Sequence, residues 1–115
     1  MDDNILFSLP GNMELTELIA KKLAIEIGKA EIRSFPDGES YIRIDSEVKN
    51  KTVILISTLN DPNSKVLPLL FMAQTLKELG AKKLCLVSPY LSYMRQDKQF
   101  QPGEAITSKI GRAHV

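Results

Sequence analysis

The chain has 115 residues, of which 43% are hydrophobic and 25% charged, and its formal net charge at pH 7 is +1. This length suits one domain, which can bury roughly 60–70% of its unfolded surface. The balanced charge argues against nucleic-acid binding, which usually needs a basic excess on one face. No apolar stretch approaches the ~20 residues that span a bilayer, and the acidic start is unlike a signal peptide. We therefore expect a soluble, cytoplasmic protein that binds neither nucleic acid nor membrane.

The first elements alternate between strand and helix patterns. Residues 5–7 form a short apolar run that ends at Pro10 and Gly11, which predicts a strand and a turn. Asn12 suits the N-cap of a helix, and Gly28 stands where a C′ glycine would end it. The apolar residues between them have the spacing of one helical stripe: Leu15, Leu18, Ile19, Leu23 and Ile27.

Two alternating segments and a uniformly apolar one follow. Residues 31–35 and 40–44 alternate apolar and polar side chains around Pro-Asp-Gly-Glu at 36–39, a pattern that predicts a β-hairpin. Pro36 presets φ in this turn, and Gly38 suits the position that needs a positive φ. Residues 53–56 are all apolar, as expected of a strand buried on both faces of a parallel sheet.

A second helix is expected to open at residues 61–64 and to end at Gly80. Pro68 is acceptable because we expect it to lie in the first turn. The main stripe is Leu69, Met72, Ala73, Leu76 and Leu79. Further apolar side chains on other sides predict a well-covered helix: Leu67, Leu70 and Phe71.

Residues 84–87 predict another buried strand, and a polar loop at 88–103 separates it from the start of a third helix near residue 104. Cys85, in that strand, is the single cysteine, so no internal disulfide forms and a reducing cytoplasm fits best. The order of elements indicates an α/β fold: a doubly wound, mostly parallel sheet with a small antiparallel hairpin.

The last six residues, 110–115, resemble the translation of a common sequencing-adaptor oligonucleotide. We therefore expect an N-terminal domain at 1–109 that is truncated at its C-terminus, followed by a non-native tail at 110–115. A natural terminus is the competing interpretation. His114, the only histidine, lies in this tail and is given no role.

Two loops follow predicted strands, where ligands of open α/β sheets bind: residues 57–61 and 88–103. In the second loop, Arg95 offers a planar fork to a phosphate or stacks on a base, and Lys98 supplies a mobile charge for a polyphosphate. Asp97 suits ribose hydroxyls or metal-bound water. A solvated loop whose charges pair with one another is the alternative.

The turn at 36–39 also has two interpretations. Plain turn chemistry explains Pro36 and Gly38. It does not explain an aromatic residue, Phe35, directly before the turn, or the carboxylates of Asp37 and Glu39, which together suit an adenine amino group. Neither a catalytic triad nor zinc-ligand spacing is present in the sequence.

Taken together, these residues resemble the N-terminal domain of ribose-phosphate pyrophosphokinase (phosphoribosyl diphosphate synthetase). The resemblance covers residues 5–109 and rests on motifs at 7–12, 35–40, 88–98 and 102–109, in the family's order and spacing. It implies a phosphoribosyltransferase-like N-terminal domain. It also implies transfer of diphosphate from ATP to ribose 5-phosphate, which gives phosphoribosyl diphosphate for nucleotide biosynthesis.

The resemblance also assigns site residues. Two segments would bind ATP. The segment from the same subunit comprises Arg95, Gln96, Asp97 and Lys98. The segment that reaches the adenine across a dimer interface comprises Phe35, Asp37, Gly38 and Glu39. Mg²⁺ is implied as cofactor, bound mainly by residues outside this chain. A homo-oligomer built from dimers, a hexamer in the family, is expected. No catalytic residue is assigned, so the chain alone should be inactive.

Two other functions fit the same residues. A non-catalytic regulatory paralogue of the synthetase would keep this fold and lose catalytic residues further along. A generic nucleotide-binding or flavodoxin-like module would have only the sheet in common with the synthetase.

Overall fold

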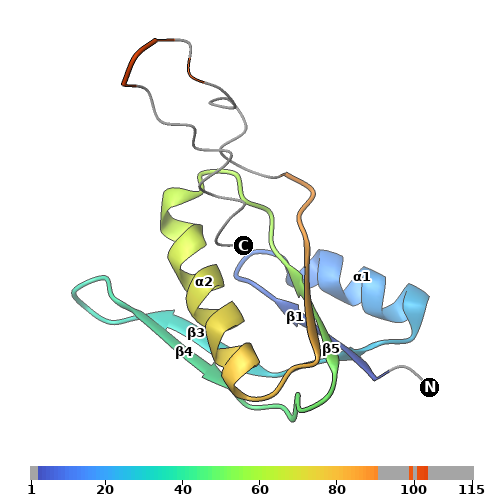
Figure 1. Ribbon diagram of the computed structural model, residues 1–115. Helices are drawn as coiled ribbons and strands as arrows, with labels where there is room; N and C mark the ends of the chain where they lie inside the picture. The colour runs from blue at the N-terminus through green and yellow to red at the C-terminus, as the bar shows by residue number, and fades with distance from the viewer. Residues whose placement is uncertain (1–2, 91–98, 100, 104–115) are drawn as a thin grey trace.

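A computed structural model describes residues 3–90, 99 and 101–103 (Figure 1). The elements in chain order are β1 (Asn4–Ser8), α1 (Met13–Leu23), β2 (Glu26–Ile27), β3 (Ala30–Ser34), β4 (Ser40–Ile44), β5 (Thr52–Ile56), α2 (Asn63–Glu78) and β6 (Lys83–Val87). The third helix expected near residue 104 and the tail at 110–115 lie outside the described residues.

The main sheet has the strand order β2-β1-β5-β6, and each described pairing in it is parallel. Helices α1 and α2 lie on opposite faces of this sheet (Figure 1). Strands β3 and β4 form a separate antiparallel pair beside α2. The doubly wound α/β fold with a small antiparallel hairpin is therefore confirmed. The described part of the chain contains no helix long and apolar enough to cross a membrane.

The principal core lies between the sheet and α2. Alternate side chains of β1 and β5 point to this face, since side chains alternate along a strand. Each fully buried aliphatic or aromatic side chain contributes ~1.5–3 kcal/mol to stability. The buried members are Ile5, Phe7, Leu9, Val48, Val53, Leu55, Leu59, Leu69, Met72 and Leu76.

Helix α1 is shorter than the apolar stripe predicted. It ends at Leu23, and Ala24 takes the left-handed C-cap conformation with φ 55° and ψ 48°. Ile27 belongs to β2, where it pairs with Leu6. The predicted stripe was therefore too long. Ile27 has the spacing of the helical residues, but it belongs to the next strand. Leu18 remains 55% exposed in the described structure.

Gly28 has a different role from the helix-ending glycine that the sequence suggested. It follows β2, and its N–H donates to the Leu6 carbonyl at 2.7 Å. A Cβ at this position would lie 2.4 Å from the Phe7 ring. Gly28 is thus required because an aromatic ring from β1 packs directly onto its backbone.

Helix α2 confirms the predicted end at Gly80, which has φ 96°, but differs in two other respects. Because the helix begins at Asn63, Pro68 lies in its second turn and removes the N–H that would bond the Ser64 carbonyl. The expectation of a well-covered helix is also wrong. Leu67 is 55% and Phe71 46% exposed, because the sheet and hairpin cover only one side of the helix in the described structure.

Strand β6 is less buried than expected. It pairs with β5 and forms one edge of the described sheet, so its residues are half-buried or exposed. Cys85 is a free, half-buried cysteine in the described structure, whereas the sequence suggested full burial.

Replacement of Gly28 by alanine should lower the free energy of unfolding by about 1–3 kcal/mol, because the Phe7 ring has to move away from the new methyl group. Urea denaturation measures this change. Lys29→Ala, a substitution of an exposed neighbour, is the matched control and should change stability little. Equal stability of the Gly28→Ala variant and the unsubstituted chain would contradict the packing argument.

Candidate functional site

The hairpin presents the predicted residues 35–39 at its tip, away from the rest of the molecule (Figure 1). Its two faces differ in character. The face toward the core carries partly buried apolar side chains, two of which, Ile32 and Ile42, are directly paired across the strands. The outer face carries charged and aromatic side chains, including the pair Arg33 and Tyr41. The alternating pattern therefore anchors one face and leaves the other free to bind.

The turn itself is tightly defined by backbone hydrogen bonds. The Phe35 N–H donates to the Glu39 carbonyl at 2.7 Å, and the Gly38 N–H donates to the Phe35 carbonyl at 2.9 Å. Gly38 has φ 96°, which confirms the expected positive φ. Together these features describe a three-residue hairpin loop with a glycine in the left-handed position.

The ring of Phe35 is held in place by its neighbours. The Arg33 guanidinium carbon lies 5.4 Å from the centre of the Phe35 ring and 4.3 Å from that of Tyr41. The two rings meet edge to face at 5.8 Å, and Arg33 Nε donates to Glu31 Oε2 at 2.8 Å. Phe35 still has 40% of its surface exposed, so part of the ring is free to stack on a planar ligand.

The two carboxylates at the tip have different surroundings. One oxygen of Asp37, Oδ1, accepts the backbone N–H of Glu39 at 3.0 Å, so Asp37 helps to shape the turn. Glu39 is exposed, and its carboxylate makes no hydrogen bond or ion pair within the described residues. Glu39 is therefore fully available as an acceptor, and Asp37 keeps one unused oxygen.

The second predicted segment cannot be placed beside the first. Arg95, Gln96, Asp97 and Lys98 lie outside the described residues. The structure therefore positions the residues of the hairpin tip, and the single adenine site formed by the two segments stays a prediction.

The loop at 57–61 follows β5 and is tied to the loop after β1. The buried side chain of Asn12 accepts the Thr58 N–H through Oδ1 at 3.0 Å and donates through Nδ2 to the carbonyls of Leu9 and Pro10. Asn12 was expected to cap α1 with its side chain. It occupies the N-cap position but makes no side-chain cap bond, because its amide joins the two loops instead.

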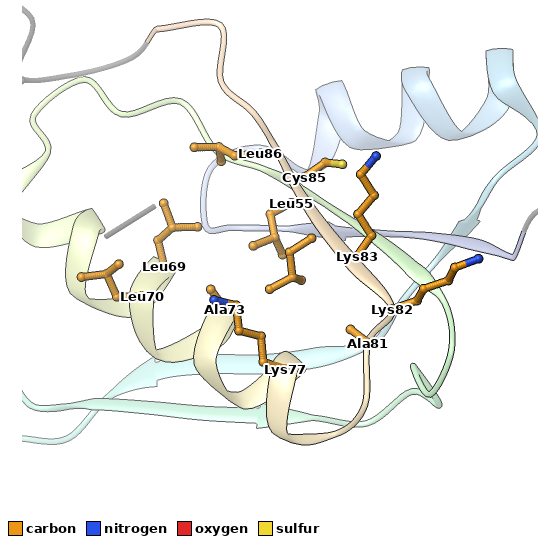
Figure 2. Close-up of a pocket in the computed structure, with 11 residues that line it drawn as sticks. Leu55, Leu69, Leu70, Ala73, Lys77, Ala81, Lys82, Lys83, Cys85 and Leu86 are labelled. Carbon is orange, nitrogen blue, oxygen red and sulfur yellow. The ribbon is translucent and has the colours of Figure 1, made fainter. Parts of the chain in front are cut away.

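A cavity of about 260 Å³ lies between α2 and β6 (Figure 2). Its walls are mostly aliphatic, with the side chains of Lys77, Lys82 and Lys83 around it. It contains no predicted site residue and few polar groups that converge on one point. The cavity therefore does not have the features of a nucleotide site.

Within the described part of the chain, no three His, Cys, Asp or Glu side chains come together to hold a metal ion. The Mg²⁺ that the resemblance implies stays a prediction, with most of its ligands expected outside this chain.

A parallel sheet with helices on both faces, and with polar loops at the carboxyl ends of its strands, defines a doubly wound α/β domain. The sequence model described as the N-terminal domain of ribose phosphate pyrophosphokinase matches residues 4–113. The chain belongs to this family.

Individual proteins agree with this assignment. The chain is 47% identical over 96 residues to ribose-phosphate pyrophosphokinase of Saccharolobus solfataricus, covering 83% of this chain and 33% of that protein. It is 40% identical over 106 residues to the protein of the same name in Fusobacterium nucleatum, covering 91% of this chain and 34% of that protein. The chain thus spans about a third of the length of these curated relatives.

Solved structures show the same fold. Phosphoribosylpyrophosphate synthetase from Mycobacterium smegmatis matches with a TM-score of 0.88 and 27% identity, over 96% of this chain and 37% of that one. A purine phosphoribosyltransferase from Pyrococcus horikoshii matches with a TM-score of 0.57 and 19% identity, over 79% of this chain and 65% of that one. The second likeness concerns the fold alone.

The sequence motifs did not indicate the residues that support Phe35. Arg33 and Tyr41 are directly paired in the hairpin, and Phe35 lies two residues from Arg33 on the same face. The period-two alternation and the position of the turn predict this pairing, because together they fix the register of the two strands. Arg33 and Tyr41 could therefore have been found from the sequence.

Arg33 and Tyr41 should be energetically coupled by about 0.5–1 kcal/mol, because the guanidinium lies over the Tyr41 ring. A double-mutant cycle with Arg33→Met and Tyr41→Leu, followed by urea unfolding, measures this coupling. The same cycle between Arg33→Met and Tyr90→Leu, a substitution of an exposed tyrosine after β6, is the control and should be additive. Additivity in both cycles would show that the stack contributes nothing to stability.

Proposed function

We propose that this chain is the ATP-binding N-terminal part of a ribose-phosphate diphosphokinase. The intact enzyme transfers the β,γ-diphosphoryl group of ATP to the anomeric hydroxyl of ribose 5-phosphate, and it releases phosphoribosyl diphosphate and AMP. The product serves nucleotide biosynthesis in the cytoplasm. The observation that carries this proposal is the half-exposed Phe35 ring at the hairpin tip, supported by Arg33 and Tyr41, in a chain of this family.

The hairpin tip has the chemistry that recognition of adenine requires. A purine has a flat apolar face and an exocyclic amino group that donates hydrogen bonds. Stacking of a base on an aromatic side chain contributes ~1–3 kcal/mol. The free oxygen of Asp37 and the carboxylate of Glu39 are acceptors for the amino group.

The rest of the site is proposed from the sequence. Arg95, Gln96, Asp97 and Lys98 bind ATP in this proposal, with the cations directed at the phosphates. Phosphoryl transfer depends mostly on positioning and charge neutralisation, which suits cationic side chains. Mg²⁺ is proposed from the family resemblance, and no step of the reaction is assigned to it.

We also propose that the adenine site is shared between two copies of the chain in a homo-oligomer. The hairpin tip extends beyond the body of its own subunit (Figure 1), so it is available to a neighbouring copy. A second subunit would then contribute residues 95–98 to the base that Phe35 stacks on.

Phe35→Leu should weaken ATP binding about tenfold, because leucine keeps apolar volume and removes the ring that stacks on the base. Isothermal titration calorimetry with ATP measures the affinity. Phe71→Leu replaces an exposed ring on α2 and is the matched control, which should bind like the unsubstituted chain. Tripolyphosphate, which has no base, should bind both variants equally. Unchanged ATP affinity in Phe35→Leu would contradict the proposed adenine contact.

The chain alone should not turn over ATP and ribose 5-phosphate, because it spans about a third of the relatives' length and contains no assigned catalytic residue. A coupled assay for AMP release tests this expectation. A version extended with the downstream two thirds of a relative is the positive control. Turnover by the 115-residue chain would show that it is catalytically self-sufficient.

A further inference from the structure

We propose that the pocket between the carboxyl end of β5 and the first turns of α2 binds a phosphate group. The pocket has a volume of about 220 Å³ and is lined by Leu9, Pro10, Ser57, Ser64, Lys65 and Pro68. None of these residues belongs to the hairpin tip or to the segment 95–98. The proposal therefore concerns a separate site and does not depend on the adenine contacts.

Ser57 supplies the first observation. It is 1% exposed, and it shares its side of the chain with Leu55, whose side chain faces α2. Its backbone N–H donates to the Val87 carbonyl, but its hydroxyl forms no hydrogen bond within the described residues. A buried hydroxyl without a hydrogen-bond partner is unfavourable. We therefore expect the Ser57 hydroxyl to donate to an acceptor bound in the pocket that it lines.

Lys65 supplies the second observation. Its ammonium group donates to the Thr58 carbonyl at 3.4 Å and to Asn60 Oδ1 at 2.8 Å, and both acceptors are uncharged. No carboxylate lies within ion-pair distance of Lys65 in the described structure. An ammonium group has three donors, so one donor and an uncompensated positive charge remain for an anion.

The start of α2 adds to this charge. The helix has 16 residues, no acidic residue in its first turn and no side-chain cap at Pro62. The amino end of a helix carries a partial positive charge that attracts anions. This end lies where β5 finishes (Figure 1), and the carboxyl ends of strands are where open α/β sheets bind ligands.

The three groups together define the class of ligand. A hydroxyl donor, an ammonium group and a helix amino end favour a compact oxyanion with several acceptor oxygens. Free inorganic phosphate and the phosphate of a sugar phosphate or nucleotide share this chemistry. The experiment therefore has to separate these sources.

A two-dimensional ¹H–¹⁵N NMR titration of the 115-residue chain with inorganic phosphate, at constant ionic strength, tests the site. Saturable shifts are expected at the backbone amides of Ser57, Ser64 and Lys65. Lys65→Met should weaken binding about tenfold, because it removes a charged donor. Ser57→Ala should weaken it several-fold, while the alanine fits the buried position without strain.

Lys77→Met removes a cation from the last turn of the same helix and is the matched control. The absence of saturable shifts, or equal weakening by Lys65→Met and Lys77→Met, would overturn the proposal. Unchanged phosphate binding in Ser57→Ala would also overturn the proposal. Circular dichroism of each variant verifies that the fold is retained.

Parallel titrations with ribose 5-phosphate and ATP identify the source of the phosphate. The affinity is read from the shifts of Ser57, Ser64 and Lys65 alone. Tighter binding of either compound than of inorganic phosphate at these amides assigns the pocket to that compound, and equal or weaker binding of both assigns it to free phosphate. Phe35→Leu should bind inorganic phosphate normally even if it has lost ATP. Failure of the adenine contact and failure of this pocket are therefore distinguishable.

Discussion

Burial of β1 and β5 at the centre of the sheet is the constraint from which the other features follow. Both strands have neighbours on each side and helices over both faces, so their side chains are largely removed from water. Their carboxyl ends are fixed at the same edge of the sheet because they run parallel in register. The Asn12 amide then joins the loops that follow them. The positions of the loop at 57–61 and of the amino end of α2 depend on this arrangement.

The two-stranded sheet of β3 and β4 positions the residues of the proposed adenine contact. Its apolar face, with Ile32 and Ile42, packs beside the core, and its outer face carries Arg33, Phe35 and Tyr41. The same alternation that anchors the hairpin therefore orients the ring proposed to bind adenine. Lys65 and the amino end of α2 offer positive charge, and the hairpin offers an aromatic face and carboxylates. The two proposed binding regions therefore differ in chemistry and come from separate parts of the fold.

The sequence predicted the fold class and most elements because their hydrophobic periods are distinct. The hairpin was located correctly, since alternation on both sides of a Pro-Asp-Gly turn is typical of two paired antiparallel strands. Gly28 was misassigned because the ring that approaches it belongs to β1, distant in the sequence. Coverage of Leu67 and Phe71 was overestimated, because an apolar residue on a helix does not specify what packs against it. The candidate site was predicted in part. The tip residues were identified, and the hairpin register would also have indicated Arg33 and Tyr41, whereas the unpaired hydroxyl of Ser57 depends on contacts between distant segments.

The antiparallel pairing of β3 with β4 is complete within the hairpin, and neither strand adds to the main sheet. The hydrogen bonds that define the loop at 36–39 lie within the hairpin itself, so changes at this loop do not reach the main sheet, whereas Gly38 and Asp37 are required for the shape of the turn. The side chains of Phe35 and Glu39, which are proposed to contact a nucleotide base, can therefore change without disturbing the parallel sheet. In the proposed function, the preference for adenine over another base is thus separable from the stability of the domain.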